Sequence, residues 1–219
     1  MNNYMKKAIV LGGSRGIGKA ISESLKTLDI DVVAASKADI DTSNMESVRK
    51  FLQTYSNTDI LVLNTGGPPV RKFDEISEDD WNHYHNQLFV GFCTILQKIS
   101  VNDNGYIFVI TSNVIKEPNE KLIISSAYRA AFSSVFKILS KDFAKREISC
   151  INIAPGPINT DRTKELIDNV DEFVDTLPMK RLGKPEEIGN FVKSIIENDI
   201  KYLSGVVINF DGANSDFIF

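Results

Sequence analysis

The sequence lacks the features that would place it in a membrane, in a disulfide framework or on nucleic acid. No apolar run among its 219 residues approaches the roughly 18 residues that cross a bilayer. Cysteine occurs only twice, as Cys93 and Cys150, and both lie within apolar patterns, so we expect reduced core thiols. The formal net charge is −4, which argues against nucleic acid as a main partner, since duplex affinity comes chiefly from lysine and arginine. These absences predict a cytoplasmic protein with neither a membrane nor a nucleic-acid partner.

Histidine is also scarce, and the two residues present, His83 and His85, lie two positions apart on an expected helix. Side chains two apart on a helix point to different faces, so the pair is not placed to share one ion. We therefore expect no metal site, and we interpret both histidines as exposed or interface residues.

Short apolar strands alternate with amphipathic helices along the whole chain, which is typical of βαβ units around a parallel sheet. Because no repeat, low-complexity tract or linker interrupts the pattern, we predict a single α/β domain over residues 1–219, with a doubly wound, Rossmann-like sheet. The expected strands are residues 8–11, 31–36, 59–63, 106–110, 149–154 and 206–210, and the expected helices are residues 17–28, 45–52, 78–99, 125–145 and 185–197. A polar, acid-rich stretch at 159–178 is expected to be a mobile loop, with one helical turn or more, that closes over a substrate with Phe173, Val174 and Leu177 as apolar lining.

A glycine-rich turn, G-G-S-R-G-I-G at residues 12–18, follows the first strand and opens a helix. Backbone N–H groups in such a turn can approach a pyrophosphate, and the helix N-terminus adds partial positive charge. Glycine is also the default residue of any tight turn, but the strand before and the helix after it favour a dinucleotide site. The residues expected to contact the nucleotide here are Gly12, Ser14, Arg15, Ile17 and Gly18.

The end of the second strand distinguishes NADP(H) from NAD(H). An NAD site has an acid there, which binds the ribose 2′-hydroxyl. This chain has Ser36 and Lys37 instead, with Arg15 close by in the glycine turn. Asp39 and Asp41 come after the expected end of the strand. Two cations and a hydroxyl suit a 2′-phosphate, so we predict NADP(H) as the cofactor.

The motifs of this chain resemble those of the short-chain dehydrogenase/reductase family, and they follow one another in the family's order over nearly the whole chain. The glycine turn resembles the family's T-G-x-x-x-G-I-G, and Asp39-Ile40 resembles the aspartate–aliphatic pair whose aspartate meets the adenine amine. Asn64-Thr65-Gly66 resembles the N-A-G that supports the ribose side of the cofactor. The run P-G-P-I-N-T at 155–160 resembles the loop that covers the nicotinamide amide. From this loop the resemblance implies cofactor contacts by Pro155, Gly156, Ile158 and Thr160.

The resemblance also carries expectations about architecture. R-L-G-K-P-E-E-I-G at 181–189 and G-V-V-I-N-F-D-G-A at 205–213 complete the family's C-terminal run. The segment between the family's second and fourth strands is short in this chain, which implies a missing helix and a reduced third strand. Family members assemble through two long helices, here 78–99 and 125–145, so the resemblance implies a homodimer or homotetramer.

The catalytic positions depart from the family's Asn, Ser, Tyr and Lys. Only the serine is retained, as Ser112 in I-T-S. Leu88 stands at the asparagine position, Ser125 at the tyrosine position and Arg129 at the lysine position. A subgroup of the family carries N-T-G-G-P-P, a K-E-P after the serine strand, and S-x-x-x-R in place of Y-x-x-x-K. This chain resembles that subgroup, with Lys116 opening its K-E-P.

Two functions remain open at this point. One is an NADP(H)-dependent oxidoreductase that acts on a carbonyl or alcohol, with Ser112, Ser125 and Arg129 as catalytic residues and Arg129 also donating to the nicotinamide ribose. Serine is a poor replacement for a phenol as proton donor, so a water held by the two serines, Tyr128 or Lys116 are the candidate donors. The other is an NADP(H)-binding sensor or non-catalytic assembly partner, which the loss of three catalytic positions favours.

Overall fold

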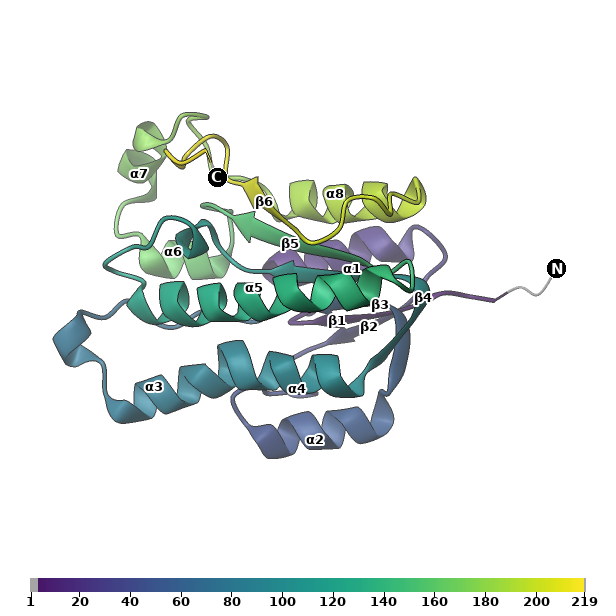
Figure 1. The fold of residues 1–219 in the computed structure, drawn as a ribbon. Coiled ribbons are helices and arrows are strands. Elements are labelled where there is room, and N and C mark those ends of the chain that lie inside the picture. Colours follow the sequence, from purple (N-terminus) through teal and green to yellow (C-terminus); the bar gives the residue numbers. More distant parts are fainter. Residues whose placement is uncertain (1–3, 219) are drawn as a thin grey trace.

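The computed structural model describes residues 4–218, whose helices and strands form three layers (Figure 1). The strands are β1 (Lys7–Leu11), β2 (Asp31–Ala35), β3 (Asn57–Leu63), β4 (Ser100–Ile110), β5 (Ser149–Pro155) and β6 (Val206–Phe210). The helices are α1 (Gly16–Lys26), α2 (Met45–Thr54), α3 (Glu78–His85), α4 (Gly91–Lys98), α5 (Ile123–Ala144), α6 (Asp161–Leu166), α7 (Val170–Thr176) and α8 (Pro185–Glu197). The strands make one parallel sheet, with α1 and α8 on one face and α2, α4 and α5 on the other (Figure 1).

The strand order β2-β1-β3-β4-β5-β6 confirms the doubly wound, Rossmann-like fold. β1 pairs with β2 on one side and with β3 on the other, with Lys7 opposite Asp31 and Ala8 opposite Ile60. The chain therefore changes winding direction between β1 and β3. In open parallel sheets, ligands bind in the crevice that this reversal opens at the carboxyl ends of the strands.

The third strand of the family pattern is absent from the described chain, so the expected reduced third strand is wrong. After β2 the chain turns through residues 36–44 into α2 and then enters β3. Side chains occupy the backbone donors of this segment: Asp39 accepts from the Ser36 N–H, and Asp41 accepts from the Ser43 N–H. Donors held in such local turns are not available for a strand ladder.

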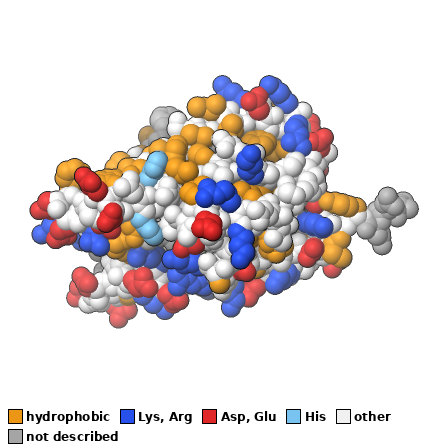
Figure 2. Space-filling model, turned by 90° about the horizontal axis from the view of Figure 1, so that it is seen from below, with side chains coloured by type: hydrophobic (Ala, Val, Ile, Leu, Met, Phe, Trp, Pro, Cys, Tyr) orange, Lys and Arg blue, Asp and Glu red, His pale blue; other side chains and the backbone are white. Residues whose placement is uncertain are grey.

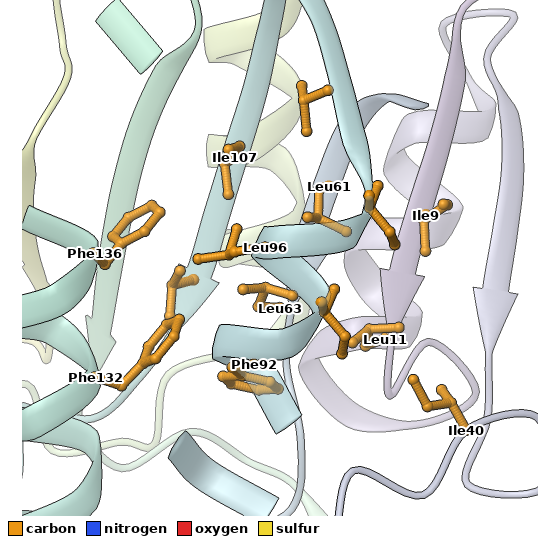
Figure 3. Packing of buried hydrophobic residues seen from close by; sticks show 14 of the residues in the cluster. Ile9, Leu11, Ile40, Leu61, Leu63, Phe92, Leu96, Ile107, Phe132 and Phe136 are labelled. Atoms are coloured by element: carbon orange, nitrogen blue, oxygen red, sulfur yellow. The ribbon is translucent and has the colours of Figure 1, made fainter. Parts of the chain in front are cut away.

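Each central strand sends alternate side chains to the two faces of the sheet, and both sets are apolar. Ile9 and Leu11 pack under α4 and α5, whereas Ala8 and Val10 pack under α1 and α8. Figure 3 shows the first of these cores, where Phe92 of α4 meets the ring of Phe132 of α5 edge-on at 5.2 Å. A strand that is apolar on both faces is typical of a parallel sheet covered on both sides, which fixes the strand ends that carry the site.

The helix expected over 78–99 is interrupted in the structure. It consists of α3, a π-helical turn at Asn86–Val90, and α4. Ser77 caps α3 as expected, since its hydroxyl accepts from the Asp80 N–H and the Asp80 carboxylate accepts from the Ser77 N–H. A π-helical turn inside an α-helix changes the direction of the side chains around it and is frequent at functional sites. Leu88, in this turn, is buried in the core.

The acid-rich stretch expected as a loop contains two short helices, α6 and α7. Thr160 caps α6 by accepting from the Thr163 N–H, and Asn169 caps α7 by accepting from the Glu172 N–H. The following helix, α8, begins at Pro185 and ends at Glu197, the bounds that the sequence predicts. Proline suits the first position of a helix, because its missing N–H has no partner there in any case.

Cys93 is half-buried and Cys150 is buried, and both are free thiols, as expected. Burial raises the pKa of both, that of Cys150 to about 12, so neither is a reactive thiolate near neutral pH. Within residues 4–218 no helix is both long enough and apolar enough to cross a bilayer. The same residues include no group of three or more His, Cys, Asp or Glu that could hold a metal ion.

Candidate functional site

A cavity of about 730 Å³ opens at the carboxyl ends of the strands, beside the reversal between β1 and β3. This is within the usual size range of small-molecule and cofactor sites. The predicted site residues that line it are Gly12, Ser14, Arg15, Ile17, Ser36, Lys37, Ile40, Asn64, Thr65, Gly66, Ser112, Ser125, Arg129, Pro155, Gly156, Ile158 and Thr160. The predicted residues that do not line it are Gly18, Asp39, Lys116 and Tyr128.

The glycine turn after β1 makes such close contacts that a side chain at two of its glycines would not fit. A Cβ atom at Gly12, whose φ is +60°, would lie 2.6 Å from the Asn64 Nδ2 atom. That amide donates to the carbonyl oxygens of Leu11 and Gly12, so the end of β3 braces the turn. A Cβ atom at Gly18 would lie 2.2 Å from the Gly12 carbonyl oxygen. Gly18 therefore lets α1 pack closely on the turn, which corrects its expected place as a cavity contact.

The turn after β2 corrects the adenine-side assignment. The Asp39 carboxylate accepts from the Ser36 hydroxyl at 2.7 Å and from the Ser36 N–H at 2.8 Å, which lowers the pKa of Asp39. This hydrogen bonding turns Asp39 away from the cavity, whereas Asp41 lines it. Asp41 lies 3.4 Å from the Lys37 ammonium group. The adenine-side candidate is thus Asp41, two positions later than the sequence suggests.

Arg129 is the most deeply buried charged group of the site, with 7% of its surface exposed. Its Nε donates to the Ser125 hydroxyl at 3.2 Å, and its two terminal nitrogens donate to the carbonyl oxygens of Ile110 at 3.0 Å and Thr65 at 3.4 Å. Burial, with a smaller contribution from the charge of Arg162, lowers the pKa of Arg129 to about 10. The guanidinium is therefore still a cation at neutral pH. Among the residues that the structure describes, no carboxylate pairs with it.

Two serine hydroxyls face the cavity near this guanidinium. Ser112 follows β4; its hydroxyl accepts weakly from the Val114 N–H and donates to the Asn113 side chain at 3.3 Å. Ser125 lies in the first turn of α5, and its oxygen accepts from Arg129. None of the hydrogen bonds found among the described residues uses the hydrogen of this hydroxyl, so it can donate into the cavity.

The other candidate proton donors lie outside the cavity lining. The Tyr128 hydroxyl donates to the Trp81 carbonyl oxygen at 3.2 Å, and burial raises the pKa of Tyr128. The Lys116 ammonium group lies 5.1 Å from the centre of the Phe217 ring. The geometry therefore favours the two serines over Tyr128 and Lys116.

The neighbour of Leu88 supplies a polar contact that the sequence does not reveal. Gln87 lines the cavity and donates to the Gly66 carbonyl at 2.9 Å and to the Thr65 hydroxyl at 3.2 Å. It lies in the π-helical turn, where the ordinary helical period no longer tells which side chain points inward. His83 and Tyr84 of α3 also line the cavity. Figure 2 shows both histidines of the chain (pale blue) at the surface of this face.

Helix α6 forms the outer wall of the cavity. A Cβ atom at Gly16 would lie 3.3 Å from the Thr160 methyl group, so the start of this wall rests on the glycine turn. Arg162, Glu165 and Leu166 also line the cavity. Phe173, Val174 and Leu177, expected as apolar lining, are not among the residues that line this cavity. Leu177 is buried and lines a separate small hollow, which Pro157, Ile158 and Met179 also line.

Sequence comparisons cover most of the chain. Residues 38–213 match a family described as Enoyl-(Acyl carrier protein) reductase. The 3-oxoacyl-[acyl-carrier-protein] reductase FabG of Chlamydia muridarum is 28% identical over an alignment of 245 positions, gaps included, that covers 97% of this chain and 99% of the relative. The NADPH-dependent reductase BacG of Bacillus subtilis is 25% identical over an alignment of 252 positions that covers 95% of this chain and 97% of the relative.

Solved structures share the fold over the whole domain. A short-chain dehydrogenase/reductase from Serratia marcescens BCRC 10948 superposes with a TM-score of 0.83 at 26% identity, covering 96% of this chain and 98% of that one. A blue fluorescent protein from a metagenomic library, crystallised in complex with NADPH, superposes with a TM-score of 0.87 at 23% identity, covering 98% of this chain and 100% of that one.

Proposed function

The chain belongs to the short-chain dehydrogenase/reductase family, and from this premise we propose that it is an NADP(H)-dependent oxidoreductase that reduces a carbonyl substrate with a serine–arginine site. The observation that carries the proposal is the Arg129–Ser125 pair, a buried cation and a hydroxyl that open on the same cavity as the glycine turn.

The residues present fit a dinucleotide. The absence of a side chain at Gly12 lets Asn64 brace the turn, whose backbone N–H groups can receive a pyrophosphate. Asp41 would meet the adenine, Asn64 and Thr65 would support the ribose side, and the 155–160 loop would cover the nicotinamide amide. When bound, the cofactor supplies the hydride for the carbonyl carbon.

The choice of NADP(H) rests on Arg15 and Lys37, which both line the cavity near the end of β2. Asp39 disfavours a phosphate at this place, because its negatively charged carboxylate lies beside Ser36 at the same end of β2. Asp41 also pairs with Lys37, at 3.4 Å. A phosphate in direct contact with both cations would gain charge-assisted hydrogen bonds from each, which offset the repulsion by these two carboxylates. Two relatives support this choice by their names, the NADPH-dependent reductase and the protein crystallised with NADPH.

In the proposed reaction the protein binds the carbonyl oxygen and handles the proton. The Ser125 hydroxyl donates to that oxygen, the Ser112 hydroxyl does so once it turns from Asn113, and the positive charge of Arg129 stabilises the negative charge that develops on the oxygen. The oxygen then takes a proton from a water held by the two serines, or from the Ser125 hydroxyl, which regains its proton from that water. Arg129 keeps its own proton, since its pKa of about 10 lies well above neutral pH.

The test is NADPH oxidation with a panel of ketones, aldehydes and 3-oxoacyl thioesters, followed by the loss of absorbance of the reduced cofactor. The thioesters belong in the panel because several relatives are named 3-oxoacyl-[acyl-carrier-protein] reductases. We expect turnover with at least one carbonyl. Tight NADPH binding without turnover on any of them would instead support the sensor or assembly-partner function.

We also propose that the chain forms a homodimer or homotetramer through α3–α4 and α5. Ile138 of α5 has 66% of its surface exposed, and hydrophobic side chains gather on the face that Figure 2 shows. Exposed apolar patches of this kind often mark protein interfaces. Light scattering at micromolar concentration tests this proposal, and a monomer would contradict it.

A further inference from the structure

Arg162, in helix α6, lines the cavity and reaches the loop that follows β3. Its guanidinium lies over the backbone of Gly67, where an added Cβ atom would be 3.8 Å from Nε, and it donates to the Pro68 carbonyl oxygen. One third of the Arg162 side chain is exposed. Helix α6 thus carries a cation across the mouth of the cavity to the loop that follows β3.

This cation is near a second one, Arg129. Arg129 donates to the Thr65 carbonyl oxygen and Arg162 to that of Pro68, three residues further along the same loop, and both arginines line the cavity. The charge of Arg162 also contributes to lowering the pKa of Arg129. Arg129 has only neutral partners among the described residues. The one carboxylate at hand for Arg162 is that of Glu165, 3.5 Å away and 63% exposed. Like charges held close together in a partly buried site favour an anion between or beside them.

The cofactor phosphates do not account for this excess of positive charge. The pyrophosphate is expected at the glycine turn, on which Thr160 rests, and the 2′-phosphate at Arg15 and Lys37. Arg162 lies instead against the Gly67–Pro68 backbone, in a cavity that Tyr84 and Leu166 also line. An anion at Arg162 would therefore belong to the second molecule in the cavity.

We propose that the carbonyl substrate carries a carboxylate group and that Arg162 binds this carboxylate, with Glu165 as its competitor for the guanidinium. The inference rests on the proposed reductase function and names its substrate class: an oxo acid. A planar guanidinium presents paired N–H donors that match the two oxygens of a carboxylate. Arg129 then remains available for the carbonyl oxygen, so that each guanidinium faces one end of the substrate.

Binding can be measured without turnover. The NADP⁺-loaded protein is titrated calorimetrically with 4-phenylbutanoate and with the neutral 4-phenylbutanamide. We expect the acid to bind about tenfold or more tighter than the amide, as charge-assisted hydrogen bonds to one arginine allow. Arg162→Gln should abolish this preference, and Glu165→Gln should increase it. Lys164→Gln is the matched control, because Lys164 is on the same helix but is exposed and outside the cavity lining.

Absence of a preference for the acid in the wild-type protein, including failure of both probes to bind at millimolar concentration, would overturn the inference. So would an Arg162→Gln protein that loses NADP⁺ affinity as strongly as acid affinity, because Arg162 would then be a cofactor ligand. Folding of each variant is checked independently of ligand binding, by circular dichroism and thermal unfolding; if Arg162→Gln is unstable, Arg162→Lys replaces it, with a smaller preference expected.

A turnover experiment separates this inference from the proposed function. With NADPH, 4-oxopentanoate is compared with its methyl ester. A higher kcat/KM for the acid that falls to the value of the ester in Arg162→Gln supports both proposals. Equal reduction of acid and ester supports the reductase and overturns the carboxylate site. Preferential binding of 4-phenylbutanoate without reduction of any carbonyl supports the carboxylate site and overturns the reductase.

Discussion

Arg129 donates its Nε–H to the hydroxyl of Ser125 across one turn of α5, at 3.2 Å. The rest of the guanidinium is fixed by the backbone at the ends of β4 and β3, through the carbonyl oxygens of Ile110 and Thr65. The serine oxygen is thus aligned by a charge that is itself held by the sheet. This alignment links the fold to the chemistry that we propose and is the source of the first two predictions.

Ser112→Ala and Ser125→Ala should each lower kcat by roughly 10²–10⁴-fold while leaving NADPH affinity nearly unchanged, since proton donation matters mainly in the transition state. The measurement is steady-state kinetics together with NADPH titration. Ser126→Ala is the control, because that buried hydroxyl donates to the Leu122 carbonyl in the same helix and does not line the cavity. Turnover that survives both active-site substitutions would remove the serines from the mechanism.

Arg129→Ala should weaken NADPH binding and destabilise the fold. The carbonyl oxygens of Ile110 and Thr65 lose their donor in a buried site, at a cost of about 1–3 kcal/mol for each acceptor left unpaired. Arg129→Lys keeps the charge but lacks the planar, branched guanidinium that reaches all three partners. Its losses of NADPH affinity and of stability should therefore be intermediate. Urea unfolding and NADPH titration measure the two effects. A lysine variant equal to wild type in both would show that the guanidinium geometry is unimportant.

Lys37→Asp should shift the cofactor preference from NADP(H) toward NADH, by about tenfold or more in relative affinity. Asp39→Asn should act in the opposite direction, since it removes a negative charge beside Ser36. Titration of both reduced cofactors against wild type and the two variants decides the matter. Tighter NADH than NADPH binding by the wild-type protein would show that the cation pair is not a phosphate site.

The pH dependence of stability should include a contribution from Glu187. Its carboxylate accepts from both terminal nitrogens of Arg181 at 2.8 Å and from the Lys184 N–H, and the Arg181 contact chiefly lowers its pKa from 4.5 to about 2. A lowered folded-state pKa means that this stabilisation is present above pH 4.5 and is lost as the pH falls toward 2.

Since this ion pair is partly exposed, we expect Glu187→Gln to lower the free energy of unfolding by about 1 kcal/mol or less at pH 7. The difference between variant and wild type should shrink between pH 4.5 and pH 2 in denaturant titrations. A difference that stays constant over this range would mean that the carboxylate charge does not contribute.

The sequence predicts the sheet well because the strands contain short runs that are apolar on both faces, and the long helices that pack on the sheet carry a 3.6-residue period. Helix α8 shows how local signals can suffice: Pro185 begins it, and Ile188, Val192 and Ile195 form its buried face. The glycine turn is predicted equally well, because the spacing of its glycines depends on contacts within a few residues and with the end of β3.

The remaining errors arise where side-chain contacts decide the outcome. Asp39 and Asp41 are both plausible near the adenine by position, and only the hydrogen bonds of Asp39 to Ser36 exclude it. Gln87 lines the cavity because of a π-helical turn that the periodicity of the sequence does not predict. Arg162 lies in an acid-rich stretch without a strong pattern, and its place depends on contact with Pro68, far away in the sequence.

The absent third strand leaves β2 as an outer strand of the sheet in the part of the chain described. Such an edge presents unpaired backbone N–H and C=O groups, which invite aggregation by edge-to-edge pairing. This edge is only five residues long, begins with the exposed Asp31 and ends in the hydrogen-bonded turn at 36–44. The short length of β2, the charge of Asp31 and the hydrogen-bonded turn after the strand thus oppose edge-to-edge pairing with other chains. Loosening that turn would threaten solubility as well as the adenosine end of the cavity.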